Sequence, residues 1–184
     1  MRPSYYIVEP TTCCNLNCGM CPNRLLLEKG DMEFDIFRKA IDTISKDAKG
    51  ILLYGLGEPM LHNRIFDMIR YAKTHTDAFI IIATNGTMLD ADNSRRLIDA
   101  GPDKIVIGFD SLEPAIYEKM RNGAKFEKTL RNVTGFLELN SGRIRTTIIR
   151  VCSDDNPKED LKHDEYFSRY GCDIKTSQMN DWLG

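Results

Sequence analysis

The chain has 184 residues, and its 25 Lys and Arg against 27 Asp and Glu give a formal net charge of −2. A chain of this length can bury a sizeable core without disulfides, and we expect one domain over residues 1–184. The balanced charge offers no basic excess for nucleic acid or for an anionic membrane surface. No apolar run is long enough to span a bilayer, and residues 1–10 lack the apolar stretch of a secretory signal, so we expect a cytoplasmic protein.

Strand-like and helix-like segments alternate along the chain. Short apolar or β-rich runs predict strands at residues 5–8, 51–54, 79–83, 104–107, 144–151 and 172–175. Apolar residues at helical spacing predict helices between these strands, including one at residues 91–100 that stops at Gly101-Pro102. Asn156-Pro157 predicts the start of the helix before the last strand.

Repeated β-then-α units predict parallel strands joined by right-handed crossovers, with the helices on the outside. Six units are too few for a closed eight-stranded barrel, which leaves an open partial (β/α)6 barrel or a doubly wound sheet. In either fold, ligands gather at the C-terminal ends of the strands. The cysteine loop and the loops that carry Gly55, Asn85 and Asp110 all follow strands, so we expect them to converge on one rim.

Four of the six cysteines lie within residues 13–21, which indicates metal ligation and not a disulfide scaffold. Cys14, Cys18 and Cys21 have the spacing C-x3-C-x2-C. Three thiolates on one loop can hold three irons of a cubane cluster and leave the fourth iron open to a small molecule. An electron-transfer cluster or a structural zinc site would want four ligands. Ordinary free thiols are expected for the remaining cysteines, Cys13, Cys152 and Cys172.

With this motif in the loop after the first strand, the chain resembles the radical SAM superfamily of enzymes, which have a partial (β/α)6 barrel with parallel strands, open on one side. The resemblance runs from residue 5 to about residue 175. It implies that Cys14, Cys18 and Cys21 hold a [4Fe–4S] cluster whose open iron binds S-adenosylmethionine (SAM). One electron then splits SAM into methionine and a 5′-deoxyadenosyl radical, which abstracts a hydrogen atom from the substrate.

A glycine-rich loop follows the second predicted strand. Gly55 and Gly57 let the backbone approach a ligand, and the carboxylate of Glu58 can receive an ammonium group. The loop resembles the "GGE" stretch of the family, which implies that these three residues surround the amino group of SAM. The chain departs from that pattern at Leu56, where the first glycine of the pair is usual. The alternative is a plain strand-to-helix turn with an exposed Glu.

Two shorter motifs end the third and fourth strands. Asn85 lies in a Thr-Asn-Gly turn that resembles the family's "TNG", which implies a contact with the methionyl or ribose part of SAM; a turn with no further role is the alternative. Residues 108–111 resemble the family's "S-x-D-G", which implies that Asp110 lies near the ribose. Gly108 replaces the usual Ser, and Asp110 could equally cap the next helix.

Basic side chains supply one more candidate. Arg150 lies near the end of the fifth strand, where relatives place a polar or basic residue towards the SAM carboxylate, and an Arg fork suits a carboxylate. A solvated Arg is the alternative. His62, His75 and His163 have no metal-ligand spacing, and we expect all three at the surface.

Residues 178–184 resemble the segment that leads into a cysteine-rich "SPASM" domain in many relatives. We therefore expect either a natural minimal enzyme or a core domain truncated before such a domain. The resemblance implies a peptide, protein or sugar-like small-molecule substrate, and a small electron donor such as flavodoxin or ferredoxin. The alternatives are a non-catalytic module that holds an iron–sulfur cluster or zinc and senses redox state, and an ordinary zinc protein.

Overall fold

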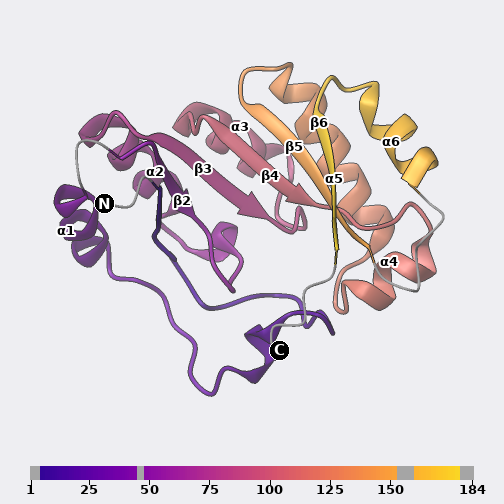
Figure 1. Cartoon of the computed structure of the whole chain (residues 1–184), viewed down its shortest axis with the longest axis horizontal. Helices are drawn as coiled ribbons and strands as arrows, with labels where there is room; N and C mark the ends of the chain where they lie inside the picture. The colour runs from indigo at the N-terminus through magenta and orange to yellow at the C-terminus, as the bar shows by residue number, and fades with distance from the viewer. Residues whose placement is uncertain (1–4, 45–47, 153–159, 179–184) are drawn as a thin grey trace.

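The computed structural model describes residues 5–44, 48–152 and 160–178, and its strands form a single parallel sheet (Figure 1). The order of the strands across the sheet is their order in the sequence. The strands are β1 Tyr5–Ile7, β2 Gly50–Leu53, β3 Phe79–Thr84, β4 Lys104–Gly108, β5 Arg145–Cys152 and β6 Asp173–Gln178. The predicted partial (β/α)6 barrel with parallel strands is confirmed, and each strand lies within a few residues of its predicted position.

The helices are α1 Phe34–Thr43, α2 Ile65–His75, α3 Ala91–Ala100, α4 Pro114–Met120, α5 Phe126–Asn140 and α6 Asp160–Ser168. Two short 3-10 helices, η1 Pro22–Leu25 and η2 Pro59–Leu61, lie in the loops after β1 and β2. The predicted bounds of α3 are confirmed, because Asp90 caps its first turn and Gly101 ends it with φ 70°. The predicted helix start at Asn156-Pro157 lies outside the described residues. In the described parts of the chain, none of the helices combines the length and apolar character that crossing a bilayer requires.

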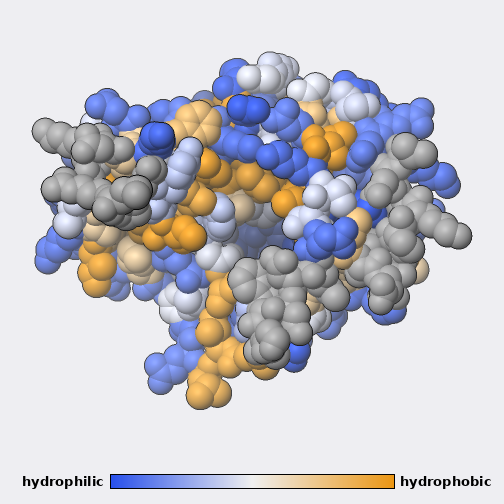
Figure 2. Space-filling view, in the orientation of Figure 1, coloured by the Kyte–Doolittle hydropathy of each residue, from blue (hydrophilic) through white to orange (hydrophobic). Residues whose placement is uncertain are grey.

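Strand alternation gives the sheet two unlike faces. On the outer face, which the helices cover, seven aliphatic side chains have no exposed surface: Ile51, Leu53, Ile80, Ile82, Ile105, Ile107 and Ile148. Burying a side chain of this size contributes roughly 1.5–3 kcal/mol. The alternate strand residues form what we call the inner face, which looks towards the viewer in Figure 1 and is hollowed in Figure 2. This open inner face is where a ligand can reach the sheet.

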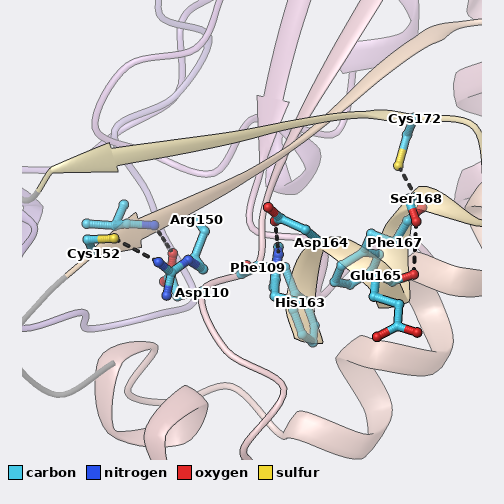
Figure 3. Close-up of polar contacts among 11 residues, drawn as sticks. Phe109, Asp110, Arg150, Cys152, His163, Asp164, Glu165, Phe167, Ser168 and Cys172 are labelled. Atoms are coloured by element: carbon cyan, nitrogen blue, oxygen red, sulfur yellow. Dashed lines mark hydrogen bonds and ion pairs between the residues drawn. The ribbon is translucent and has the colours of Figure 1, made fainter. Parts of the chain in front are cut away.

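Two of the three histidines are not at the surface, contrary to the sequence prediction. His62 is 4% exposed, and its Nε2 lies 3.1 Å from the carbonyl oxygen of Met32. His163 is fully buried, with Nε2 2.8 Å from the carbonyl oxygen of Phe109 (Figure 3), and burial lowers its pKa. His75 is exposed as expected. The error arose because each buried ring bonds a backbone group far away in the sequence.

Candidate functional site

A cavity of about 350 Å3 lies at the C-terminal ends of the strands. The cysteine loop, the loop after β2, the end of β3 and the inner face of β4 to β6 supply its walls. The predicted site residues that line it are Cys14, Cys18, Cys21, Gly55, Gly57, Glu58 and Asn85. Asp110 and Arg150 are not among the lining residues. The loops that the sequence analysis expected to converge on one rim therefore meet at this cavity.

The three cysteines of the C-x3-C-x2-C motif all face this cavity. Burial raises the pKa of the Cys14 and Cys18 thiols, Cys21 raises both further, and Cys14 also raises the pKa of Cys18. Such mutual effects require the thiols to be close to one another. Among the described residues, no three His, Cys, Asp or Glu side chains gather closely enough to hold a single metal ion. Three thiols of one loop at one wall are nevertheless the donor set of an iron–sulfur cluster with an open iron, so the residues fit that group.

Gly57 locks the glycine-rich loop onto the cysteine loop. The Glu58 amide donates to the carbonyl oxygen of Cys13 over 2.8 Å, and the Cys13 amide donates to the Thr11 hydroxyl over 2.9 Å. A Cβ at Gly57 would overlap the carbonyl oxygen of Thr11 and lie 2.8 Å from that of Cys13. Only glycine fits this close approach of two backbones. Cys13 thus acts through its backbone, and its side chain does not line the cavity.

Glu9, two residues after β1, supports the site from outside the cavity and was missed by the sequence analysis. Its Oε1 accepts hydrogen bonds from the amides of Leu56 and Gly57, the second over 3.0 Å. A Cβ at Gly55 would overlap this carboxylate, so Gly55 makes room for it. The amide of Leu56, where the chain departs from the family pattern, is therefore held by Glu9. An acidic residue between the first strand and the cysteines was the only signal in the sequence.

Glu58 is 2% exposed and joins the loops that follow β2 and β3. Its Oε1 accepts from the Thr84 hydroxyl over 2.7 Å and the Met60 amide over 3.1 Å, while Oε2 accepts from the Asn85 amide over 2.7 Å. Burial raises its pKa although these hydrogen bonds oppose the shift. The alternative of an exposed Glu on a plain turn is wrong. A carboxylate offers about four acceptor positions, so these three bonds leave one on Oε2.

The side chain of Asn85 ties the β3 turn to the cysteine loop. Its Nδ2 donates over 3.0 Å to Asn15, which lies between Cys14 and Cys18, and its Oδ1 accepts from the amide and the hydroxyl of Thr87. Asn15 in turn donates to the Thr87 hydroxyl over 2.8 Å. Asn85 is 7% exposed and still lines the cavity. It therefore shapes a turn and orders the cysteine loop at the same time.

Asp110 acts behind the cavity wall, because it is fully buried and holds Arg121. Two hydrogen bonds join the pair, Nε to Oδ2 and Nη2 to Oδ1, the second over 3.1 Å. Oδ1 also accepts from the Val151 amide of β5 over 2.9 Å. The alternative of a helix cap is wrong, because α4 begins at Pro114 and no side chain caps it. The predicted contact of Asp110 with the SAM ribose stays a prediction.

Arg121 is the second residue that the sequence analysis missed, and it lines the cavity with its side chain 14% exposed. Burial alone would lower its pKa, but the charge and hydrogen bonds of Asp110 raise it, so Arg121 stays cationic. A Cβ at Gly108 would lie 2.7 Å from Nη2 of Arg121. Gly108, where the family usually has Ser, thus leaves room for this guanidinium. The sequence signal was an Arg eleven residues after Asp110, across an intervening helix.

Arg150 lies on the outer face of β5 and has no exposed surface. Its Nη2 donates to the Cys152 sulfur over 2.8 Å, and the guanidinium lies beside Asp110 (Figure 3). The alternative of a solvated Arg is wrong. The predicted contact with the SAM carboxylate stays a prediction. In the structure, Arg150 lies behind the part of the cavity wall that β5 supplies.

The family model described as "Radical SAM superfamily" matches residues 8–165 of the chain. The chain belongs to the radical SAM superfamily. Members of this superfamily are enzymes, and an iron–sulfur cluster and SAM are inherent to it. The matched region contains the cysteine motif and all of the cavity wall up to β5.

Several radical SAM relatives are similar in sequence. The tungsten-containing aldehyde ferredoxin oxidoreductase cofactor-modifying protein of Pyrococcus furiosus is 38% identical over 114 residues, which are 60% of this chain and 32% of the relative. An AdoMet-dependent heme synthase of Methanosarcina barkeri is 30% identical over 129 residues, 68% of this chain and 36% of the relative. The chain thus spans about a third of the length of these curated relatives.

Solved radical SAM structures share the fold. SuiB of Streptococcus suis superimposes with a TM-score of 0.80 at 16% identity, covering 99% of this chain and 41% of SuiB. The protein anSMEcpe with bound AdoMet gives a TM-score of 0.78 at 19% identity, covering 98% of this chain and 52% of anSMEcpe. At these identities the likeness shows the fold alone.

Proposed function

We propose that this chain cleaves SAM reductively at a [4Fe–4S] cluster held by Cys14, Cys18 and Cys21, and so generates a 5′-deoxyadenosyl radical. The observation that carries the proposal is that these thiols share one 350 Å3 cavity with Glu58 and Arg121. When bound, the cluster supplies the electron that breaks a carbon–sulfur bond of SAM. The chain's own residues bind SAM, orient it and exclude water.

Opposite charges at the cavity suit the two ends of an amino acid. The remaining acceptor position of Glu58, beside the backbone of Gly55 and Gly57, offers a partner for the amino group of SAM. Arg121 has five N–H groups, and its hydrogen bonds to Asp110 use two of them, which leaves donors for a carboxylate. Asp110 is a positioning residue in this arrangement because it holds the guanidinium of Arg121.

Two other predicted residues have supporting places in this proposal. Asn85 lines the cavity and offers polar contacts to the methionyl or ribose part of SAM. Arg150 lies on the outer face of β5, behind the cavity wall, where it donates to Cys152 of the same strand. Apolar side chains of Leu16, Val106 and Ile149 form much of the remaining wall. They exclude water, which protects a reactive intermediate from side reactions.

A peptide or protein is the favoured substrate, and a flavodoxin or ferredoxin is the favoured electron donor. The support for the first is that two structural neighbours were solved with peptides, SuiB with the precursor peptide SuiA and anSMEcpe with the Cp18Cys peptide. Other relatives are named as a heme synthase and a GTP 3′,8-cyclase, so small-molecule substrates also occur in the superfamily.

The test is anaerobic reconstitution with iron and sulfide, followed by SAM and dithionite. We expect about four irons per chain and the formation of 5′-deoxyadenosine. Cys18→Ser should abolish both, whereas Cys13→Ser, a matched control in the same loop, should keep both because that side chain does not line the cavity. A four-iron cluster without SAM cleavage would favour a redox-sensing module. One zinc and no sulfide after anaerobic purification would favour a zinc protein.

A further inference from the structure

The inner face of β4, β5 and β6 carries charged side chains where a parallel sheet usually carries aliphatic ones. Lys104 of β4 pairs in register with Arg145 of β5, and Lys175 of β6 pairs with Ile149. Asp173 pairs with Thr147 in the row between them. Paired residues of parallel strands point to the same side of a sheet, so these side chains share one patch. We call Lys104, Arg145, Thr147, Asp173 and Lys175 the inner-face patch.

Positive charge exceeds negative charge in the inner-face patch. Its single carboxylate, on Asp173, is paired with Arg145, with Nη2 3.0 Å and Nε 3.1 Å from Oδ2. The pKa of Lys104 is lowered by burial first and then by the charges of Lys175 and Arg145, against the opposing effect of Asp173. The ammonium groups of Lys104 and Lys175 therefore lie close enough to repel each other. An anion between them would remove that repulsion.

Thr147 provides an independent observation at the same place. It is 1% exposed, and its hydroxyl has no hydrogen-bond partner among the described residues. Its neighbour Thr146, on the outer face, donates to the carbonyl oxygen of Ile144 over 3.1 Å and contacts Asn140. A buried hydroxyl without a partner is destabilising, and an acceptor that took its hydrogen would offset that loss. The unpartnered donor faces the same side as the lysines.

The inner-face patch is continuous with the cavity. Val106 and Ile149 line the cavity, and they are the strand partners of Thr147 and Lys175 respectively. A molecule held at the patch would therefore extend directly into the space where SAM is proposed to react. A loose group of solvated lysines would not explain why a buried hydroxyl between them lacks a partner.

We propose that the substrate carries an oxyanion, a carboxylate or a phosphate, which binds Lys104 and Lys175 and accepts a hydrogen bond from Thr147. The role of this subsite as a substrate anchor rests on the proposed function, but the binding of an oxyanion does not. The anchor fixes one end of the substrate on the inner face and presents the other end to the cavity. It narrows the substrate to an anionic molecule, such as a peptide with an acidic side chain.

Binding is measured by NMR on the full chain, labelled with 13C at threonine methyl groups and lysine Cε. Inorganic phosphate and glutarate are titrated separately at constant ionic strength, with chloride as the reference anion. We expect at least one oxyanion to shift the Thr147 methyl signal saturably and to raise the pKa of Lys104. The anion that binds more tightly, phosphate or glutarate, identifies the oxyanion of the substrate as a phosphate or a carboxylate. Shifts that are linear for both oxyanions, or equal to those with chloride, would overturn the proposal.

Lys104→Met and Lys175→Met should each weaken the binding at least tenfold, whereas Lys128→Met, an exposed lysine on α5, should leave it unchanged. Thr147→Val separates ligand binding from folding. It should raise the Tm without anion, because it removes the unpartnered hydroxyl, and yet weaken anion binding about fivefold. Equal binding by the wild type and all three inner-face variants would overturn the proposal.

The proposed function is read out separately, as 5′-deoxyadenosine formed without substrate. Lys104→Met and Lys175→Met should keep this uncoupled cleavage, since neither lysine lines the cavity. Anion binding without SAM cleavage would contradict the proposed function and leave the subsite standing. SAM cleavage without saturable anion binding would support the proposed function and overturn the oxyanion subsite.

Discussion

Two buried carboxylates support different parts of the cavity wall, and they are held in different ways. Glu58 accepts hydrogen bonds from neutral donors, two backbone amides and one hydroxyl. Asp110 is held by a cation, Arg121, and by one amide of β5. The first network joins backbone segments that cannot move independently, whereas the second ends in a long side chain that can. We therefore expect the Glu58 side to be rigid and the Asp110 side to adjust to a ligand.

The largest effect is expected from removing the cation. Arg121→Met takes from the fully buried carboxylate of Asp110 the cation that bonds it twice, which should lower the free energy of unfolding by about 3–5 kcal/mol. Chemical denaturation measures the loss. The double variant Asp110→Asn/Arg121→Met should recover part of it, since the carboxylate is neutralised together with the loss of the Arg121 cation. A double variant as unstable as the sum of the two single variants would contradict this account of the pair.

The backbone contact at Gly57 ranks second. Gly57→Ala places a methyl group on the carbonyl oxygen of Thr11, and we expect a loss of about 1–3 kcal/mol together with weaker iron incorporation. The matched control is Gly135→Ala, where a Cβ on α5 meets nothing within 4 Å. That change should stabilise the protein by roughly 0.5–1 kcal/mol. Equal stability of the two variants would show that the two loops can separate easily.

Glu58→Gln tests the hydrogen bonds between Glu58 and its three neutral donors. It should lower the free energy of unfolding by about 1–3 kcal/mol at pH 7, because one amide oxygen cannot accept from three donors on two sides. The pH dependence has a definite sign. The pKa of Glu58 is raised in the folded state, so its contribution is fully present below its ordinary value of 4.5 and is lost as pH rises through the folded pKa. The stability of the wild type minus that of Glu58→Gln should therefore fall as pH rises from 4.5. A difference that rises instead would place the pKa below its ordinary value.

The smallest effect is expected at Gly108, the counterpart of Gly57 on the adjustable side. Gly108→Ser restores the residue that is usual in the family, and its Cβ would meet the end of the Arg121 side chain 2.7 Å away. Because a flexible side chain can move aside, we expect a loss of only about 1 kcal/mol. The free energy of SAM binding, measured by isothermal titration on the reconstituted protein, should change by more than the free energy of unfolding does. A loss as large as that of Gly57→Ala would show that both sides of the cavity are rigid.

Local sequence signals determined most of the framework. Runs of aliphatic residues predicted β2, β3 and β4, because strands of a parallel sheet that is covered by helices are largely apolar. The turn residues Gly101-Pro102 predicted the end of α3. The spacing of Cys14, Cys18 and Cys21 indicated the kind of site, because all three ligands lie on one short loop. In each case the deciding interactions join residues close together in the sequence.

Only the tertiary structure decided which partners complete the site. Glu58 meets Thr84 across 26 residues, Asp110 meets Val151 across 41, and His163 meets Phe109 across 54. No periodicity or spacing encodes these pairs, because the sheet brings them together only after its strands are aligned. The same holds for Arg121 and for the unpartnered hydroxyl of Thr147. The sequence thus determined the loop that carries the cysteines, and the packing of six strands decided which side chains surround it, because burial and hydrogen bonding depend on neighbours in space.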